Sequence, residues 1–129
     1  MLVTIILFLL LGCAATPRSI KEQPVKRYIE TDMHYINLCQ NIFNSLIECH
    51  PNRVGFDSVK DMCIPGKKHA SVIIYTQRNG IYYSGVMALW DIYPVSENKS
   101  IIKYYDRFIV DVFANSTERW VKNGFTKCE

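Results

Sequence analysis

The chain has 129 residues, 49% of them hydrophobic, and a formal net charge of +3. This length suits one domain that can bury a core, and the sequence contains no internal repeat or low-complexity segment. The charge is uneven: residues 14–27 carry four basic side chains and one acidic side chain, whereas residues 28–129 carry eleven of each. A neutral folded part argues against a nucleic-acid partner, which would require a basic stripe.

An apolar run, Leu2 to Leu11, opens the chain and is interrupted only by Thr4. Ten residues of helix rise about 15 Å, which is about half of the hydrocarbon core of a bilayer. The run is therefore too short to span a membrane, and its length is typical of the apolar region of a signal peptide. We expect residues 1–12 to be a signal peptide. No second long apolar run follows, so no transmembrane helix is expected.

The run ends in Leu10-Leu11-Gly12-Cys13, which resembles the lipobox of bacterial lipoproteins. The resemblance implies cleavage between Gly12 and Cys13, a diacylglycerol on the Cys13 thiol, and an acyl chain such as palmitate on the new amino group. Alanine at position 14, rather than aspartate, implies sorting to the outer membrane, facing the periplasm, or to the exterior in a cell with one membrane. No lysine or arginine precedes the run, so an ordinary secretory signal cut after Ala14 or Ala15 stays open.

Residues 13–27 contain two prolines, no aromatic residue and no periodicity. This pattern predicts that the lipidated cysteine continues into a flexible basic tether. The basic side chains would lie near anionic lipid head groups, or they would simply keep a linker in solution. A single domain is expected over residues 28–129.

Four further cysteines, an even number in an exported chain, predict two disulfides: Cys39, Cys49, Cys63 and Cys128. On one helix Cys39 and Cys49 would lie about 15 Å apart, whereas a disulfide needs Cα atoms within about 7 Å. That pairing is excluded. We prefer Cys49–Cys63 with Cys39–Cys128, and Cys39–Cys63 with Cys49–Cys128 remains open.

Apolar residues at three- and four-residue steps predict a helix from near Asp32, with Thr31 or Asp32 as its cap, to near Cys49. Pro51 would prevent its continuation. A short strand, Val54–Val59, is expected next. Pro65-Gly66 then predicts a turn. The adjacent Lys67, Lys68 and His69 would hold an anion or, as we prefer, form an ordinary solvated loop.

Two strands, Ala70–Gln77 and Ile81–Ile92, flank Asn79-Gly80, a strong hairpin motif. Because both faces of the second strand are apolar, we expect it to be central and covered on both sides. The aromatic side chains on and beside these strands would pack in the core or form a partner surface. Those assigned to the partner surface are Tyr75, Tyr83, Trp90 and Tyr93.

Helical spacing returns near Ser100, and the helix begins either there or at Asp106, in which case 101–105 is a strand. Gly124 should end it. Cys128 would then fasten the chain end to the first helix. These elements predict an α+β fold: an N-terminal helix, a small antiparallel sheet centred on the 70–92 hairpin, and a C-terminal helix.

No serine-nucleophile turn, glycine-rich phosphate loop, or zinc-ligand spacing of cysteine and histidine is present, so we expect no enzyme, metal or cofactor. We expect a lipid-anchored bacterial envelope protein, held by acyl chains on Cys13, that binds a protein partner in envelope assembly, exclusion or immunity. The alternative is a secreted, disulfide-bonded eukaryotic protein. The residue types at hand do not identify a reaction.

Overall fold

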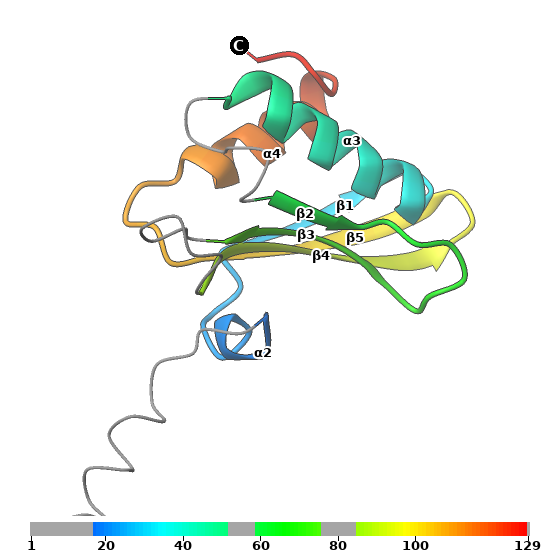
Figure 1. Cartoon of the computed structure of the whole chain (residues 1–129). Coiled ribbons are helices and arrows are strands. Elements are labelled where there is room, and N and C mark those ends of the chain that lie inside the picture. The colour runs from blue at the N-terminus through cyan, green and yellow to red at the C-terminus, as the bar shows by residue number, and fades with distance from the viewer. Residues whose placement is uncertain (1–16, 52–58, 76–84, 129) are drawn as a thin grey trace, which may run out of the picture.

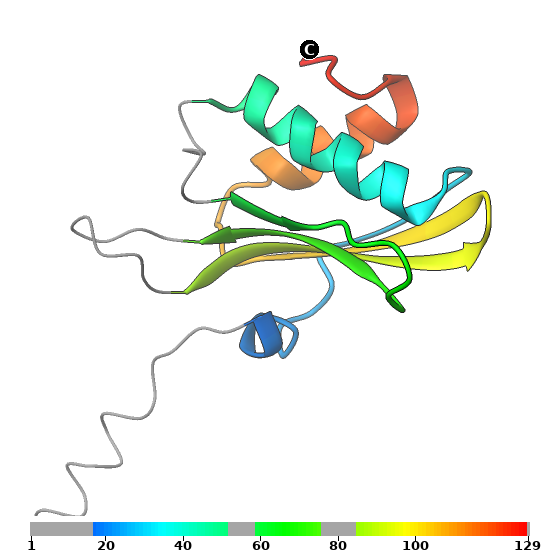
Figure 2. The ribbon, with the colours of Figure 1, turned by 45° about the vertical axis from the view of Figure 1, so that its right-hand side comes forward.

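The computed structural model describes residues 17–51, 59–75 and 85–128. The expected α+β class is confirmed: a five-stranded antiparallel sheet carries two long helices on one face, as Figure 1 shows. A short third helix lies on the opposite face, where the chain enters the domain (Figures 1 and 2). None of the helices in the described ranges is long and apolar enough to cross a bilayer.

The elements follow one another as α2 (Pro17–Ile20), β1 (Arg27–Thr31), α3 (Tyr35–Cys49), β2 (Val59–Met62), β3 (Ala70–Tyr75), β4 (Val86–Ser96), β5 (Lys99–Asp106) and α4 (Val112–Asn123). The strand order across the sheet is β1-β5-β4-β3-β2. β1 therefore closes one edge by pairing with β5, with Ile29 opposite Ile102. β4 occupies the middle of the sheet, as its two apolar faces predict.

The two faces of β4 bury different partners. Ala88, Trp90 and Ile92 are fully buried among the side chains of α3 and α4. Leu89, on the opposite face, packs with Ile20 of α2. Because side chains alternate along a strand, every second side chain of β4 lies in the main core, and the side chains between them face a smaller core beneath the sheet.

Helix α3 ends at Cys49 as expected, but its cap is His34 rather than Thr31 or Asp32. The Nδ1 atom of His34 accepts a hydrogen bond from the backbone N–H of Ile36 at 3.3 Å. The helix therefore starts later than the predicted residues because β1 extends to Thr31 and a turn separates the two elements.

The segment after Ser96 is a strand up to Asp106, and α4 begins only at Val112. A tight turn at residues 97–98 returns the chain antiparallel to β4, so Ile102 and Tyr104 alternate into the main core. The helical spacing of apolar residues between Ser100 and Ile109 is coincidental, because this stretch contains β5 and Ile109 is fully exposed. Gly124 ends α4 as predicted, with a positive φ of 120°.

The segment expected to be a flexible tether packs on the domain from Pro17 onward, which corrects that expectation for residues 17–27. Ile20 is fully buried beneath the sheet. Lys26 Nζ lies 2.6 Å from Asp106 and 2.8 Å from Asp111, and Arg27 Nε lies 2.9 Å from Glu118. The basic excess of this segment is therefore partly neutralised by the domain.

Both disulfides form, but the preferred pairing is wrong: Cys39 bonds Cys63 and Cys49 bonds Cys128. Cys39 lies on the buried face of α3, and its Sγ is 3.6 Å from the carbonyl oxygen of Ser71 in β3. Strand β2 is the neighbour of β3, so Cys63, the residue that follows β2, lies within reach of Cys39. Cys49 lies at the end of α3 beside the C-terminal tail. Cys128 thus fastens the C-terminal end of the chain to α3, as expected, but the bond is to Cys49, the last residue of that helix.

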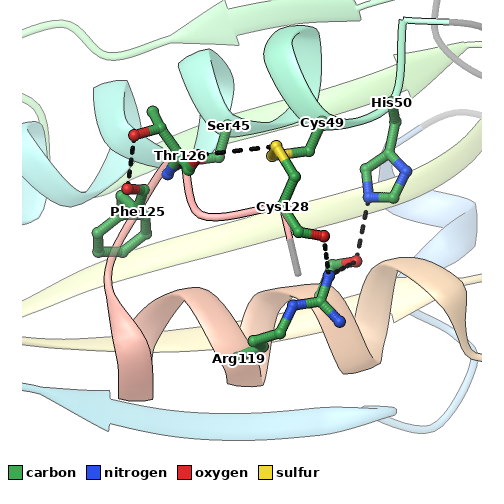
Figure 3. The surroundings of a disulfide bond; sticks show 8 residues. Ser45, Cys49, His50, Arg119, Phe125, Thr126 and Cys128 are labelled. Atoms are coloured by element: carbon green, nitrogen blue, oxygen red, sulfur yellow. Dashed lines mark hydrogen bonds between the residues drawn. A yellow bond between two sulfur atoms is a disulfide. The ribbon is translucent and has the colours of Figure 1, made fainter.

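Hydrogen bonds surround the Cys49–Cys128 bridge (Figure 3). The Thr126 N–H donates to Ser45 Oγ at 2.9 Å, and Arg119 donates to the carbonyl oxygen of Cys128 at 3.3 Å. Ser45 itself is fully buried. The tail is therefore held against both long helices by main-chain contacts as well as by the bridge.

Lys26, Tyr104 and Asp106 form a second polar cluster where β1 meets β5. The Tyr104 hydroxyl donates to the buried Asp106 at 2.6 Å, and burial followed by this hydrogen bond raises the pKa of Tyr104. Burial lowers the pKa of Lys26, but its bonds to Asp106 and Asp111 outweigh that effect and leave the pKa raised. The hydrogen bond from Lys26 lowers the pKa of Asp111.

Several expected features lie outside the described residues. These are the signal peptide and Cys13, the part of the predicted strand before Val59, the Asn79-Gly80 turn, and Tyr83.

Removing each disulfide by a pair of alanine substitutions should lower the free energy of unfolding by different amounts. The bridges span 24 and 79 residues, so loop entropy predicts losses of about 3.5 kcal/mol for Cys39–Cys63 and about 4.5 kcal/mol for Cys49–Cys128. Urea unfolding followed by circular dichroism measures both, and each variant is the control for the other. A non-reducing peptide map that joins Cys49 to Cys63 would contradict the pairing.

Stability should fall steeply above about pH 10. Tyr104 and Lys26 both have raised pKa values in the folded chain, so above the unfolded values the native state holds more protons than the unfolded state. The stabilisation that these two groups give the folded state is complete below their unfolded pKa values and is lost as the pH rises above those values. Urea unfolding between pH 7 and pH 11 measures it.

Tyr104→Phe should make the alkaline decline shallower, and Tyr28→Phe serves as the matched control because its phenol is exposed. An equally steep decline in Tyr104→Phe would refute the assignment to this cluster.

Candidate functional site

A recess of about 450 Å³ opens on the face of the sheet that α3 and α4 do not cover. Its walls come from the residue after α2, from the end of β2, from the turn that joins β2 to β3, and from β3 and β4. Figure 2 shows α2 beneath the sheet. The lining residues are Lys21, Met62, Ile64, Lys67, Lys68, His69, Ser71, Ile73, Leu89 and Asp91.

Asp91 is the buried acid of this recess, with 1% of its side chain exposed. It projects from the middle of β4, and its carboxylate has three partners. Lys21 Nζ lies 2.8 Å from Oδ2, His69 Nδ1 lies 2.9 Å from Oδ1, and the Tyr93 hydroxyl donates to Oδ2 at 2.5 Å. The ring of Tyr93 also stacks on His69 at 5.4 Å between centroids. One carboxylate thus fixes side chains from α2's end, the β2–β3 turn and β4.

The electrostatics of the cluster favour a protonated Lys21. Burial lowers its pKa, but the hydrogen bond to Asp91 and the charge of that carboxylate outweigh burial, and the pKa is raised. Burial and the hydrogen bond to Asp91 also raise the pKa of Tyr93. Near neutral pH, Lys21 is therefore a fixed cation and Tyr93 a neutral donor.

The β2–β3 turn supplies the exposed basic rim. Tyr35 of α3 donates its hydroxyl to the carbonyl oxygen of Lys67 at 3.1 Å, which holds the turn from behind. Gly66 has a φ of +83°, a conformation that glycine adopts without strain, as the Pro-Gly turn predicts. Among the described residues, the ammonium groups of Lys67 and Lys68 have no carboxylate partner. The turn therefore holds two uncompensated cations at the mouth of the recess.

The remaining walls are apolar. Ile73 and Leu89 are buried in the sheet and form the floor. Met62 and Ile64 are about half exposed and stand beside the basic turn. The recess therefore combines cationic groups with apolar surface, a combination suited to an anion that carries an apolar part.

The Asp91–His69 pair has the geometry in which a carboxylate orients a general base. In the described ranges, however, no hydroxyl or thiol is hydrogen-bonded to the other ring nitrogen of His69. No group of three or more potential metal ligands occurs in those ranges either. The arrangement supports binding of an anion more directly than catalysis.

The expected aromatic partner surface is corrected in part. Trp90 is fully buried and donates its indole N–H to Thr117 Oγ1 of α4 at 2.8 Å, so it belongs to the core. Tyr75 and Tyr93 are half-buried on the sheet face opposite α3 and α4. Residues 67–69 form an exposed loop, as expected, and they also border a recess that the sequence did not indicate.

Sequence reasoning also missed Lys21 and Asp91. A single aspartate inside an otherwise apolar strand was the available indication, because a buried carboxylate requires partners.

Asp91→Asn should lower the free energy of unfolding by about 1–3 kcal/mol, because the amide replaces a charge that holds Lys21 and His69. Backbone hydrogen exchange at residues 17–23 should accelerate as α2 loses this tie. Urea unfolding and exchange mass spectrometry measure the two effects.

Asp61→Asn is the matched control, since Asp61 is exposed on the edge strand β2. Equal effects of the two substitutions would show that the Asp91 cluster contributes no specific stability.

Comparisons with known proteins do not extend this description. No protein-family model matches the chain, and neither does any curated protein or solved structure. The chemistry of the recess therefore follows from its own contacts: one buried carboxylate, three lysines, a histidine and an apolar floor.

Proposed function

We propose that the chain is a lipid-anchored protein of a bacterial envelope that works as a small binding or accessory module. Acyl chains on Cys13 hold the domain at the membrane, where it meets a partner. Envelope assembly, exclusion and immunity to a toxin are roles of this kind. The proposed location is the outer membrane, facing the periplasm, or the exterior face of a single cell membrane.

The observation that carries the proposal is the position of α2. This helix begins four positions after Cys13, and it packs Ile20 on the face of the sheet that contains the recess. An acyl chain on Cys13 would therefore keep that face close to the bilayer. A recess on the membrane side of an anchored domain is well placed to bind a partner there.

The two disulfides support the proposed export. Such bridges form and persist in oxidising compartments, including the bacterial periplasm. Each joins segments far apart in the chain, with Cα atoms 5.6 Å and 5.0 Å apart, which suits permanent structural bridges. An oxidising compartment is also expected for the alternative, a secreted eukaryotic protein, so the disulfides support export without distinguishing the two.

The mature N-terminus distinguishes them. We expect intact-mass and peptide mass spectrometry of the native protein to find a chain that begins at a triacylated Cys13. Cys13→Ala should leave an unprocessed precursor or release a folded domain from membranes. One acyl chain gives a partition constant of only about 10⁴ M⁻¹, but several chains anchor stably. On cell fractionation, the Cys13→Ala protein should therefore be almost completely lost from the membrane as a mature chain.

Ala14→Ser is the matched control and should leave membrane association intact, because it leaves the lipid-bearing thiol in place. A mature chain that begins at Ala15 or Thr16 without lipid would overturn the proposal and favour the secreted alternative.

A further inference from the structure

We propose that the recess beneath the sheet binds the phosphate of an anionic phospholipid headgroup in the same membrane that anchors Cys13. This inference deepens the proposed function and rests on it, because it takes the bilayer to be the surface that the recess faces. The juxtaposition that carries it is a basic, partly apolar recess beside the segment that leads to the anchor.

The covalent chain limits how far this face can stand from the membrane. Three residues separate Cys13 from Pro17, so their Cα atoms lie at most about 14 Å apart. From Pro17 the chain is fixed to the domain, and Lys21 follows the buried Ile20 directly. Lys21 lines the recess. An anchored domain therefore has its recess within one short tether of the lipid surface.

The charge of the recess suits an anion. Lys21, Lys67 and Lys68 line it together with His69, against the single carboxylate of Asp91. That carboxylate is already occupied by Lys21, His69 and Tyr93, so it acts as a positioning group that holds the cations in place. The two turn lysines have no acidic partner among the described residues and remain available to a ligand.

The apolar part of the recess favours a lipid over a simple anion. Met62 and Ile64 have exposed fractions of 51% and 49% and line the recess with the basic turn. Exposed apolar side chains beside lysines match the interface of a bilayer, where phosphates lie next to glycerol and acyl carbon. A free phosphate would use the lysines alone.

The opposite side of the domain provides the comparison. The C-terminal tail lies above the helices, on the far side of the sheet from α2 (Figure 1). Lys122 and Lys127 are exposed there. They match Lys67 and Lys68 in number, charge and exposure, but they lie away from the recess. The paired variants Lys67→Gln/Lys68→Gln and Lys122→Gln/Lys127→Gln thus change net charge equally.

The experiment uses the native mature protein, with its acylation recorded by mass beforehand. The protein is reconstituted into phosphatidylcholine vesicles with or without phosphatidylglycerol, and backbone hydrogen exchange is measured over residues 62–69. Phosphatidylglycerol should slow exchange there about fivefold or more, a factor typical of one basic side chain at an anionic surface. In 1 M salt, where the Debye length is about 3 Å, the protection should disappear.

Lys67→Gln/Lys68→Gln should abolish the protection, and Lys122→Gln/Lys127→Gln should retain it. Equal exchange in the two vesicle types, or equal loss in both variants, would overturn the inference. Millimolar inorganic phosphate with phosphatidylcholine vesicles is a further arm: equal protection there would identify free phosphate and overturn the assignment to a lipid.

A failure of the headgroup site can be distinguished from a failure of the anchor. The mass measurement reports acylation of Cys13 and says nothing about the recess. The comparison between vesicle types holds the anchor constant and says nothing about acylation. An acylated chain without phosphatidylglycerol protection would overturn only the headgroup site, whereas an unacylated chain would overturn the anchor and, with it, the premise of the headgroup site.

Discussion

The different chemistry of the two faces of β4 is the constraint on which the rest of the structure depends. Ala88, Trp90 and Ile92 on one face require apolar cover, and α3 and α4 supply it. On the other face Leu89 requires Ile20, while Asp91 requires cations. Because side chains alternate along a strand, a shift of one residue would bury the wrong set on both faces. The register of this strand therefore fixes the core and the recess together.

The main elements could be predicted because local patterns agree with tertiary packing there. The apolar stripe of α3, the apolar runs of β3 and β4, and the stop at Gly124 all reflect how these elements are buried. The segment that became β5 was ambiguous, since Ile102 and Tyr105 fit helical spacing as well as a strand. Pairing with β4 on one side and β1 on the other decides it, and such pairing is not a local property.

The candidate site could be predicted only in fragments. The basic turn and the apolar strand are visible in the sequence, but Lys21 and Asp91 are 70 positions apart, and nothing local joins them. The same holds for the entering segment, whose prolines and charges suggested a free linker. Its lysines are instead paired with acids of β4, β5 and the residue before α4. Long-range ion pairs leave no periodicity, so composition misrepresents such segments.

The bridge from Cys49 to Cys128 has a mechanical consequence for a domain pulled between its two ends. Between Pro17 and Cys128 the main chain spans 111 steps, but the shortest covalent path leaves it at Cys49 after 32 steps. Fully extended, that path is about 110 Å long rather than about 390 Å. All of β3, β4, β5 and α4 lies off the line of force. Tension can strip α2, β1 and α3 from the sheet, while most of the sheet carries no load.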